Sequence, residues 1–312
     1  MGLNTLRSTL TLGEGSTPLV PARRLSERLR LELYLKCEGL NPTGSFKDRG
    51  MVVAVERAVE SGARAVVCAS TGNTAASAAA YAARAGLEAI VLTPAGATAT
   101  AKRAQARAAG ARLIEIRGSF DDALRLCCEL GKRDGFVLVN SLNPDRVEGQ
   151  KSVVGEILEQ LGSAPDVVTL PFGGGGNVSA VAAGFAEAGC SPRIVVGQAA
   201  ERATTWATAI RISEPAHAAH VAELVGAGRV EIVTLGEDEL RVAWQLLSHQ
   251  EGVFCEPASA AGLSVLERLP DVEGTTVVCI LTGHGLKDTG AVDEGGSDPV
   301  DAKLEVVLEA IG

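Results

Sequence analysis

The fold is decided by the stretch NPTGSFKDR, residues 41–49, because it places a lysine, Lys47, between a strand and a helix. Apolar residues alternate over residues 31–37, as in a β-strand, and recur at helical spacing over residues 51–59. The Pro- and Gly-containing turn therefore leads into a first helical turn whose backbone N–H groups carry partial positive charge. An ammonium group fits poorly there unless the amine is neutral, bonded or facing an anion. Taken alone, the turn still favours the simpler interpretation, an exposed lysine beside Asp48 on a solvated helix start.

The chain has the composition of an ordinary soluble globular protein, with 46% hydrophobic and 21% charged residues. Its 312 residues allow a large core and two lobes. A net charge of -9 and a pI near 5.1 argue against nucleic acid or an anionic membrane as a partner, but not against small anionic ligands. No run approaches the roughly 18 apolar residues of a spanning helix. Residues 1–12 lack the features of a secretory signal.

The cysteines indicate the redox compartment. There are seven, an odd number, most of them inside apolar runs such as residues 66–69 and 277–280, and none in C-x-x-C spacing. Buried free thiols in a reducing cytoplasm explain this pattern better than disulfides or a zinc site. We therefore expect a cytoplasmic protein without a metal centre.

Strands and helices alternate along most of the chain, which predicts an α/β fold with parallel sheets. The expected strands are 31–37, 65–69, 88–93, 112–117, 136–139, 166–170, 193–198, 230–235 and 275–281. The expected helices are 75–85, 99–109, 120–133, 148–161, 178–188, 237–249 and 258–269. Residues 200–227 are less regular. Residues 291–299 are Gly- and Asp-rich and are expected to be flexible, with a short amphipathic helix at 302–311 after them.

Several polar turns follow strands, at the sheet edge where open parallel sheets bind ligands. The most informative is the run of four glycines at 173–176 with Asn177 and Val178, which opens a helix. Glycines let the backbone approach a ligand, and the helix start aims N–H groups at an anion. The run lacks the rest of a dinucleotide fingerprint, so it predicts a single phosphate. The alternative is a tight turn, which needs only one or two glycines.

Three further turns are less specific. Ser70 to Thr74 is rich in hydroxyl and amide groups and is equally compatible with an ordinary helix N-cap. Asn140, Ser141 and Arg146 suit a phosphate or carboxylate, although a single arginine near a turn is more often a surface residue.

The last buried strand is followed by Thr282 and, between two glycines, His284. Thr282 is expected to point its hydroxyl into the same cleft. We interpret His284 as structural or supporting rather than as a catalytic base, because the chain has no nucleophile elbow. A lysine, a phosphate loop and polar strand ends on an α/β sheet are together what a pyridoxal phosphate enzyme requires.

The sequence resembles the fold type II pyridoxal phosphate enzymes and, within them, the threonine synthase family. The resemblance covers about residues 12–288 and rests on motifs in one order, at 13–19, 41–49, 70–76, 140–151, 207–212, 255–261 and 281–288. It implies two open, mostly parallel three-layer α/β/α domains with the active site in the cleft between them. Residues 1–38 plus 142–312 would form a large cofactor-binding domain, and residues 39–141 a small mobile domain.

By this resemblance, pyridoxal 5'-phosphate is the cofactor and Lys47 binds it covalently. Asn73 would bond its 3-oxygen, and Thr282 would face the ring nitrogen. The cofactor phosphate would be bound by the glycine loop, at Gly174, Gly175, Gly176, Asn177 and Val178. The substrate's carboxylate or phosphate would be bound by Ser70, Thr74, Asn140, Ser141 and Arg146.

The implied reaction converts O-phospho-L-homoserine and water into L-threonine and phosphate. The partner is thus a small amino-acid substrate, and the analogy with relatives implies a homodimer. We expect no extended regulatory domain, and therefore no allosteric control of the kind found in larger relatives. The glycine run at 173–176 looks closer to that of serine and threonine dehydratases, so a dehydratase-like lyase is one alternative. The other is a non-catalytic α/β metabolite-binding protein, against which the full motif around Lys47 argues.

Overall fold

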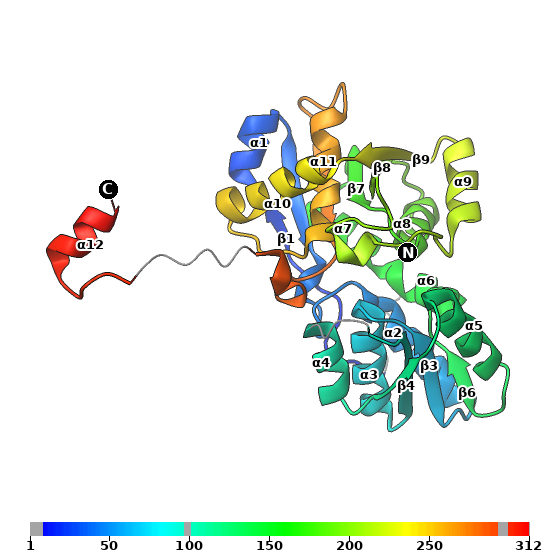
Figure 1. Ribbon diagram of the computed structural model, residues 1–312. Coiled ribbons are helices and arrows are strands. Elements are labelled where there is room, and N and C mark those ends of the chain that lie inside the picture. Colours follow the sequence, from blue (N-terminus) through cyan, green and yellow to red (C-terminus); the bar gives the residue numbers. More distant parts are fainter. Residues whose placement is uncertain (1–8, 97–100, 293–298, 312) are drawn as a thin grey trace.

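The computed structural model describes residues 9–96, 101–292 and 299–311 and contains two open sheets. The larger has six strands in the order β1-β2-β10-β7-β8-β9, and the smaller has four in the order β5-β4-β3-β6. We call the parts built on them the large lobe and the small lobe. They lie side by side, and the chain enters the small lobe after β2 and leaves it after β6 (Figure 1).

The large lobe has three layers. Its strands are β1 (Leu19–Pro21), β2 (Glu32–Cys37), β7 (Val167–Pro171), β8 (Arg193–Ala199), β9 (Val230–Leu235) and β10 (Thr276–Leu281). Only β1 is antiparallel to its neighbour among these strands. One face packs against α1 (Arg23–Leu29), α10 (Glu237–Glu251) and α11 (Ala261–Ser264). The other packs against α7 (Ser152–Leu161), α8 (Gly176–Glu187) and α9 (Ala218–Gly226).

The small lobe is also layered, around an all-parallel sheet. Its strands are β3 (Ala65–Ala69), β4 (Glu88–Pro94), β5 (Arg112–Ile116) and β6 (Phe136–Leu138). One face packs against α2 (Lys47–Glu60), α3 (Asn73–Ala85) and α4 (Ala101–Ala108). The other packs against α5 (Phe120–Leu130). Every residue of β3 is buried, as expected for a parallel strand covered on both faces. Two parallel, three-layer units confirm the predicted α/β fold class.

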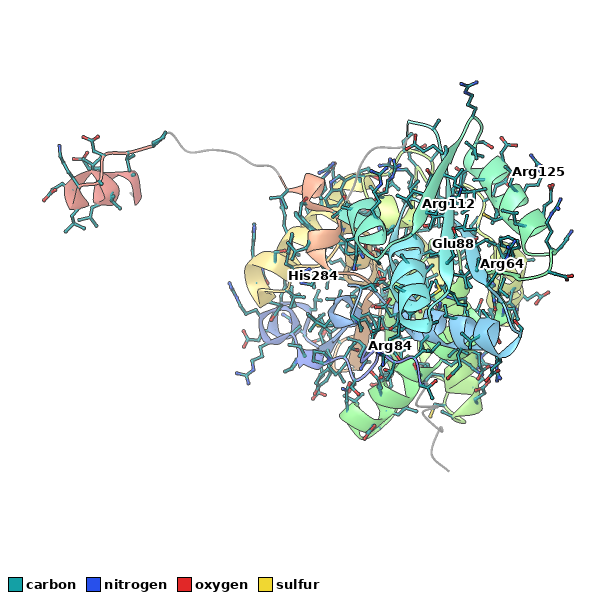
Figure 2. The ribbon with its side chains drawn as sticks, turned by 90° about the horizontal axis from the view of Figure 1, so that it is seen from below. Arg64, Arg84, Glu88, Arg112, Arg125 and His284 are labelled. Carbon is teal, nitrogen blue, oxygen red and sulfur yellow. The ribbon has the colours of Figure 1, made fainter. Side chains whose placement is uncertain are left out.

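Ion pairs between exposed side chains lie on the outer surface of the small lobe. Arg112 pairs with Glu88 on the neighbouring strand, and Arg125 pairs with Glu129 one helical turn away. In the view of Figure 2, Arg64, Arg112 and Arg125 all lie away from His284. Exposed pairs of this kind contribute about 1 kcal/mol or less each. These charges therefore contribute more to the solubility of the protein than to the stability of its fold.

The helices that join the lobes differ from the sequence prediction. The expected helix 148–161 consists of α6 (Pro144–Gln150) and α7, which meet at Lys151. Glycines bring α6 close to α2: a Cβ on Gly50 would lie 2.3 Å from the Arg146 carbonyl oxygen, and one on Gly149 would lie 2.2 Å from that of Arg49. This crossing holds the helix that begins with Lys47 against the helix that carries Arg146.

Other boundaries were harder to predict. The expected helix 258–269 is α11 between two 3₁₀ turns, η3 (Pro257–Ala260) and η4 (Val265–Arg268). The short elements β1 and α1 were not predicted, and α9 falls in the stretch judged irregular. The described end of the chain is α12 (Leu304–Ile311), which stands apart from both lobes (Figure 1). Of the segment expected to be flexible, residues 293–298 lie outside the described residues.

The structure also bears on three expectations about composition. No helix within the described ranges is long and apolar enough to cross a membrane. The described residues contain no group of three or more His, Cys, Asp or Glu side chains that could hold a metal ion. All seven cysteines are free. The division of the chain at residues 38/39 and 141/142 stays a prediction, and the strands fall on the two sides of it.

Candidate active site

Lys47 lies at the junction of the two lobes because its turn is bonded to the segment after β10. The Phe46 N–H donates to the Thr282 carbonyl oxygen at 3.0 Å, and the His284 N–H donates to the Gly44 carbonyl oxygen at 3.0 Å. Ser45 and Gly283 form an antiparallel bridge. These backbone contacts bring the predicted cofactor lysine and the predicted ring-nitrogen partner, Thr282, to one place.

The surroundings of Lys47 favour a neutral amine. Burial lowers the pKa of Lys47 to about 7; Arg146 adds to the lowering, whereas Glu256 opposes it. The amino nitrogen lies 4.6 Å from the centroid of the Phe46 ring, a contact that by itself would favour the ammonium form. A lysine with this pKa is a nucleophile at neutral pH, which an ordinary exposed lysine is not. This environment disfavours the interpretation of Lys47 as a solvated surface charge.

A buried ionic network anchors the start of α2. Arg49, two residues after Lys47, donates to Glu38 at 2.6 and 2.7 Å and to Glu156 at 2.7 and 2.7 Å. Lys36 on β2 donates to Glu156 at 2.7 Å as well. Glu38 begins η1 (Glu38–Leu40), and Glu156 lies on α7, so the network ties the small-lobe helix to two elements of the large lobe. Lys47 is thereby fixed relative to both sheets.

Asn73 and Thr282 face the same junction. Asn73 begins α3 and donates its side-chain nitrogen to both carboxylate oxygens of Glu256, at 3.1 and 3.0 Å. Its side-chain oxygen is buried and has no hydrogen-bond partner among the described residues. The Thr282 hydroxyl lies 3.2 Å from that of Ser259, which also accepts from the Gly283 N–H at 3.1 Å. Ser259 therefore orients the residue predicted to face the ring nitrogen.

The glycine loop forms an anion-binding cradle at the start of α8. Gly175 has φ +88°, a conformation that other residues rarely adopt, and a Cβ there would lie 2.9 Å from His217. His217 supports the loop from behind: its N–H donates to the Gly174 carbonyl oxygen at 3.0 Å, and its Nε2 lies 2.7 Å from the Ser141 carbonyl oxygen. In the described residues, the buried Asn177 amide nitrogen and Ser179 hydroxyl have no partner. Unsatisfied donors at a helix start fit a phosphate.

Arg146 supplies a second set of unpaired donors. It is fully buried, and its Nη1 donates to the Val139 carbonyl oxygen at 2.8 Å. Its Nε and Nη2 have no partner within the described ranges. Burial lowers the pKa of Arg146 to about 10, so the guanidinium is still charged at neutral pH. Asp48 acts on this guanidinium only electrostatically, and among the described residues no carboxylate forms an ion pair with it. A buried cation without such a pair is costly, and an anionic ligand would relieve that cost.

The other predicted substrate residues differ in whether their side chains already have hydrogen-bond partners in the protein. The Asn140 amide is committed to the Ala69 backbone, accepting from its N–H and donating to its carbonyl oxygen, both at 2.9 Å. Ser141 is tied to His217 through its carbonyl oxygen, not its side chain. The Ser70 hydroxyl accepts from the Gly72 N–H at 3.0 Å, and Thr74 follows at the start of α3. Asn140 thus aligns the ends of the small-lobe strands.

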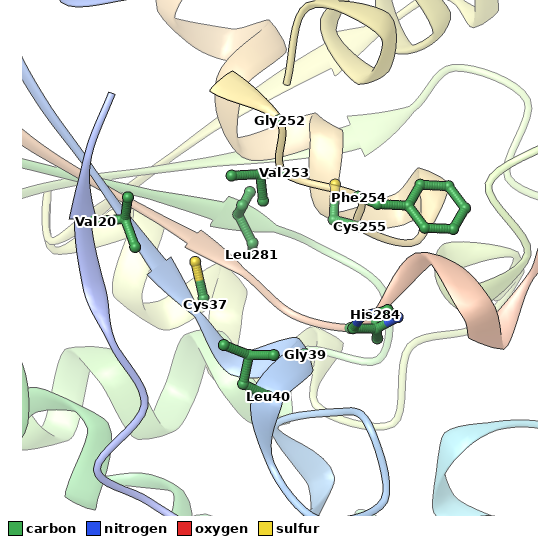
Figure 3. Close-up of a pocket in the computed structure, with 11 residues that line it drawn as sticks. Val20, Cys37, Gly39, Leu40, Gly252, Val253, Phe254, Cys255, Leu281 and His284 are labelled. Atoms are coloured by element: carbon green, nitrogen blue, oxygen red, sulfur yellow. The ribbon is translucent and has the colours of Figure 1, made fainter. Parts of the chain in front are cut away.

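His284 has a structural contact and lines a separate cavity. Its Nδ1 accepts from the Leu286 N–H at 3.1 Å, which caps η5 (Gly285–Lys287). The cavity has a volume of about 320 Å³ and apolar walls that include Cys37, Leu281 and Phe254 (Figure 3). Among the described residues that line it, none belongs to the predicted cofactor or substrate set. We therefore place the chemistry at the lobe junction and not in this cavity.

The residues at the junction fit pyridoxal phosphate, with a cradle for its phosphate, a neutral amine for its aldehyde and polar groups for its ring. The family model described as pyridoxal-phosphate dependent enzyme matches residues 10–283. A threonine synthase from Halalkalibacterium halodurans is 46% identical over 89% of this chain and 84% of its own. The chain belongs to the threonine synthase family of pyridoxal-phosphate dependent enzymes. A threonine synthase from Mycobacterium leprae is 45% identical over 97% of this chain and 91% of its own.

Membership of the threonine synthase family confirms the predicted cofactor and enzyme class. The fold is shared with a solved threonine deaminase from Solanum lycopersicum, with a TM-score of 0.77, 22% identity, and coverage of 95% of this chain and 84% of that chain. At that identity the likeness supports the fold alone. The roles assigned to individual residues stay predictions.

Sequence reasoning missed several residues of the site. Glu256, Ser259 and His217 contact predicted site residues, yet none was singled out. Glu256 and Ser259 lie in the motif at 255–261, so a signal existed, whereas His217 lies in the less regular stretch 200–227. Two lysines, Lys102 on α4 and Lys287 on η5, also reach the junction. All of these residues make their contacts with residues far away in the sequence, and local sequence patterns do not reveal such contacts.

Proposed function

We propose that this chain converts O-phospho-L-homoserine and water into L-threonine and inorganic phosphate, with Lys47 as the residue that binds pyridoxal phosphate. The observation that carries the substrate assignment is Arg146, a fully buried arginine with two unpaired donors and an electrostatic effect on Lys47. A substrate that brings its own phosphate group supplies the missing anion. The names of the close relatives agree with this reaction.

Lys47 would move protons in the reaction. Bound pyridoxal phosphate supplies an electron sink that stabilises negative charge developing at the substrate's carbon atoms. With a pKa of about 7, Lys47 can both accept and donate a proton at neutral pH. Arg146 acts on Lys47 electrostatically, so that proton transfer would take place in the field of the arginine proposed to bind the departing phosphate. Arg146 would stabilise the charge that develops on the leaving group.

Other residues would bind and orient the reactants. The N–H groups of the glycine loop, Gly174 to Gly176, and the unpaired Asn177 amide would hold the cofactor phosphate. Thr282 would meet the ring nitrogen with a neutral hydroxyl and not with a carboxylate, so that nitrogen would stay largely unprotonated. Ser70 and Thr74, at the start of α3, would bind the substrate carboxylate.

The competing proposal is a lyase that deaminates threonine or serine. The glycine-only loop at 173–176 is the observation in its favour. Such a substrate has no phosphate, and its single carboxylate, which we assign to Ser70 and Thr74, would not also pair the Nε and Nη2 of Arg146. The burial of those donors therefore favours the phosphorylated substrate.

Phosphate release from O-phospho-L-homoserine and deamination of threonine, measured on the same preparation, separate the two proposals. We expect phosphate and threonine from the first substrate and little keto acid from the second. Arg146→Met should lower kcat/KM for phosphate release by about 100-fold, from the loss of charge-assisted hydrogen bonds, while the protein keeps the absorbance of a lysine-bound cofactor. Arg84→Met is the control, because Arg84 is exposed on α3. Deamination without phosphate release would refute the substrate assignment.

We also propose a cellular location, an oligomeric state and a mobile domain for this protein. A cytoplasmic location is supported by the free thiols, of which those of Cys68, Cys255 and Cys279 are buried and have raised pKa values. A homodimer and a mobile small domain are proposed by analogy with relatives alone.

A further inference from the structure

Glu256 is a buried carboxylate at the centre of the lobe junction. It is 1% exposed and precedes η3, and its N–H donates to the Gly283 carbonyl oxygen at 2.9 Å. Both carboxylate oxygens accept from the Asn73 side-chain nitrogen. One of them, Oε2, lies 3.4 Å from the ammonium group of Lys102, which comes from the small lobe. The Glu256 carboxylate therefore contacts both Asn73, a predicted cofactor residue, and the ammonium group of Lys102.

The backbone around Glu256 is shaped to admit it. A Cβ on Gly283 would lie 2.2 Å from Oε1 and 2.3 Å from Cδ of Glu256. Gly283 directly follows Thr282, the residue predicted to face the ring nitrogen. Any side chain at position 283 would therefore displace either the carboxylate or the strand end that carries Thr282.

Glu256 also determines how Asn73 can be oriented. An ionised carboxylate only accepts hydrogen bonds, so the amide nitrogen of Asn73 must face it. The amide oxygen is then directed elsewhere, and it is the buried atom without a partner in the described part of the chain. The nitrogen lies within hydrogen-bond distance of both carboxylate oxygens. Glu256 thus fixes the Asn73 amide in one orientation.

The charges at the junction come from several elements. Glu256 acts on Lys47 of α2 and Lys287 of η5, and it pairs with Lys102 of α4. Lys102 is 3.7 Å from Asp288 and 3.4 Å from the Thr208 hydroxyl of η2 (Thr208–Ile210). Burial lowers the pKa of Lys287 to about 8, and its ammonium donates to the Thr43 carbonyl oxygen and to Gln105 of α4. The groups that act on Lys47 itself are Arg146 and Glu256.

We propose that Glu256 is a positioning residue that orients Asn73 and favours the protonated nitrogen of Lys47, and that Lys102 of the small lobe is its counter-charge. This inference rests on the proposed role of Lys47. In this proposal α4 supplies the positive charge of Lys102. Because Lys102 belongs to the small lobe and Glu256 to the large lobe, contact between the lobes sets the net charge near Lys47. Lys102 is only 4% exposed, so we expect its charge to act through Glu256 and not as a surface charge.

The test is a pH titration of the visible absorbance of the cofactor-loaded protein, which reports the proton on the Lys47 nitrogen. Glu256→Gln keeps an acceptor for Asn73 but removes the charge, so the midpoint should move to lower pH. Lys102→Met removes a cation, so the midpoint should move to higher pH. Arg103→Met is the matched control: Arg103 lies on the same helix, is also buried, and pairs with Glu115 inside the small lobe at 2.5 Å. Its midpoint should equal that of the unaltered protein.

Activity provides a second readout. Glu256→Gln and Lys102→Met should each lower kcat/KM by roughly 10- to 100-fold, the size of a lost charge-assisted hydrogen bond, and Lys102→Arg should restore part of it. If Glu256→Gln does not fold, the shift in Lys102→Met still decides the matter. Unchanged midpoints, or shifts of equal sign, in coloured variants would overturn this inference alone. An unaltered protein that stays colourless with added pyridoxal phosphate would overturn the proposed function and this inference with it.

Discussion

Replacement of Arg49 by Met would test how the cofactor lysine is held between the two lobes. Arg49 bonds Glu38 and Glu156, and the side chain of Glu38 is 1% exposed. Its removal leaves Glu38 buried with only the Thr17 hydroxyl and the Asn41 amide as side-chain partners that remain among the described residues. A buried carboxylate that loses its cation typically costs 3–5 kcal/mol, and we expect about 4 kcal/mol here.

That cost is measurable as a shift in melting temperature. A chain of this length has an unfolding entropy that converts about 4 kcal/mol into a fall of roughly 6 °C. Calorimetry or circular dichroism at pH 7 would record it. Arg57→Met is the control on the same helix, since Arg57 pairs with Glu60 at a site where both side chains are more than half exposed. Its loss should lower the melting temperature by no more than about 2 °C.

The same substitution has a pH signature. Burial alone would raise the pKa of Glu156, but hydrogen bonds from Arg49 and Lys36 lower it to about 2. A carboxylate with a lowered pKa stabilises the fold above its unfolded value near 4.5, and this contribution disappears as the pH falls toward 2. The penalty of Arg49→Met should therefore shrink over that window. A variant that melts within about 1 °C of the unaltered protein at pH 7 would refute the reasoning.

Three further predictions concern the site. Gly283→Ala would place a Cβ 2.2 Å from Glu256, so affinity for pyridoxal phosphate in an absorbance titration should fall at least about tenfold; unchanged affinity would show that Glu256 does not need this space. Gly175→Ala combines a positive φ with a 2.9 Å approach of the new Cβ to His217, so it should weaken cofactor binding, measured by equilibrium dialysis, by about 1–3 kcal/mol. Gly189→Ala is the control: it has φ +70° and nothing within 4 Å of its Cβ, so it should leave binding unchanged. Equal binding by the two variants would count against the cradle. Asn140→Ala should lower the melting temperature as well as activity, because its amide bonds the Ala69 backbone, and a loss of activity alone would make it a substrate ligand instead.

Much of the architecture was predictable because it is encoded locally. The parallel strands of both lobes are short apolar runs bounded by polar turns, and β3 was predicted with its observed bounds. The candidate cofactor residues Lys47 and Thr282 and the glycine loop could be proposed from the sequence for a similar reason. Each occupies a strand end or helix start, where the backbone conformation itself restricts the sequence.

What the sequence did not predict depends on distant contacts. Asn73 and Glu256 are separated by 183 positions, and no local pattern indicates that their side chains meet. The three residues of β1 are too few to show a period. The close crossing of α6 with α2 joins residues that are about 100 positions apart, and only the packed structure reveals it. Asn140 was expected to bind substrate because an amide at a strand end suits an anion, but the structure gives that amide a backbone partner.

The most direct measurement of the central claim is the site of covalent attachment of the cofactor. The protein is loaded with pyridoxal phosphate, reduced with borohydride, digested and examined by mass spectrometry. The account predicts a single labelled peptide that carries the cofactor on Lys47, and loss of that label in Lys47→Ala. Label on Lys102, Lys287 or another lysine, or no label at all, would contradict it.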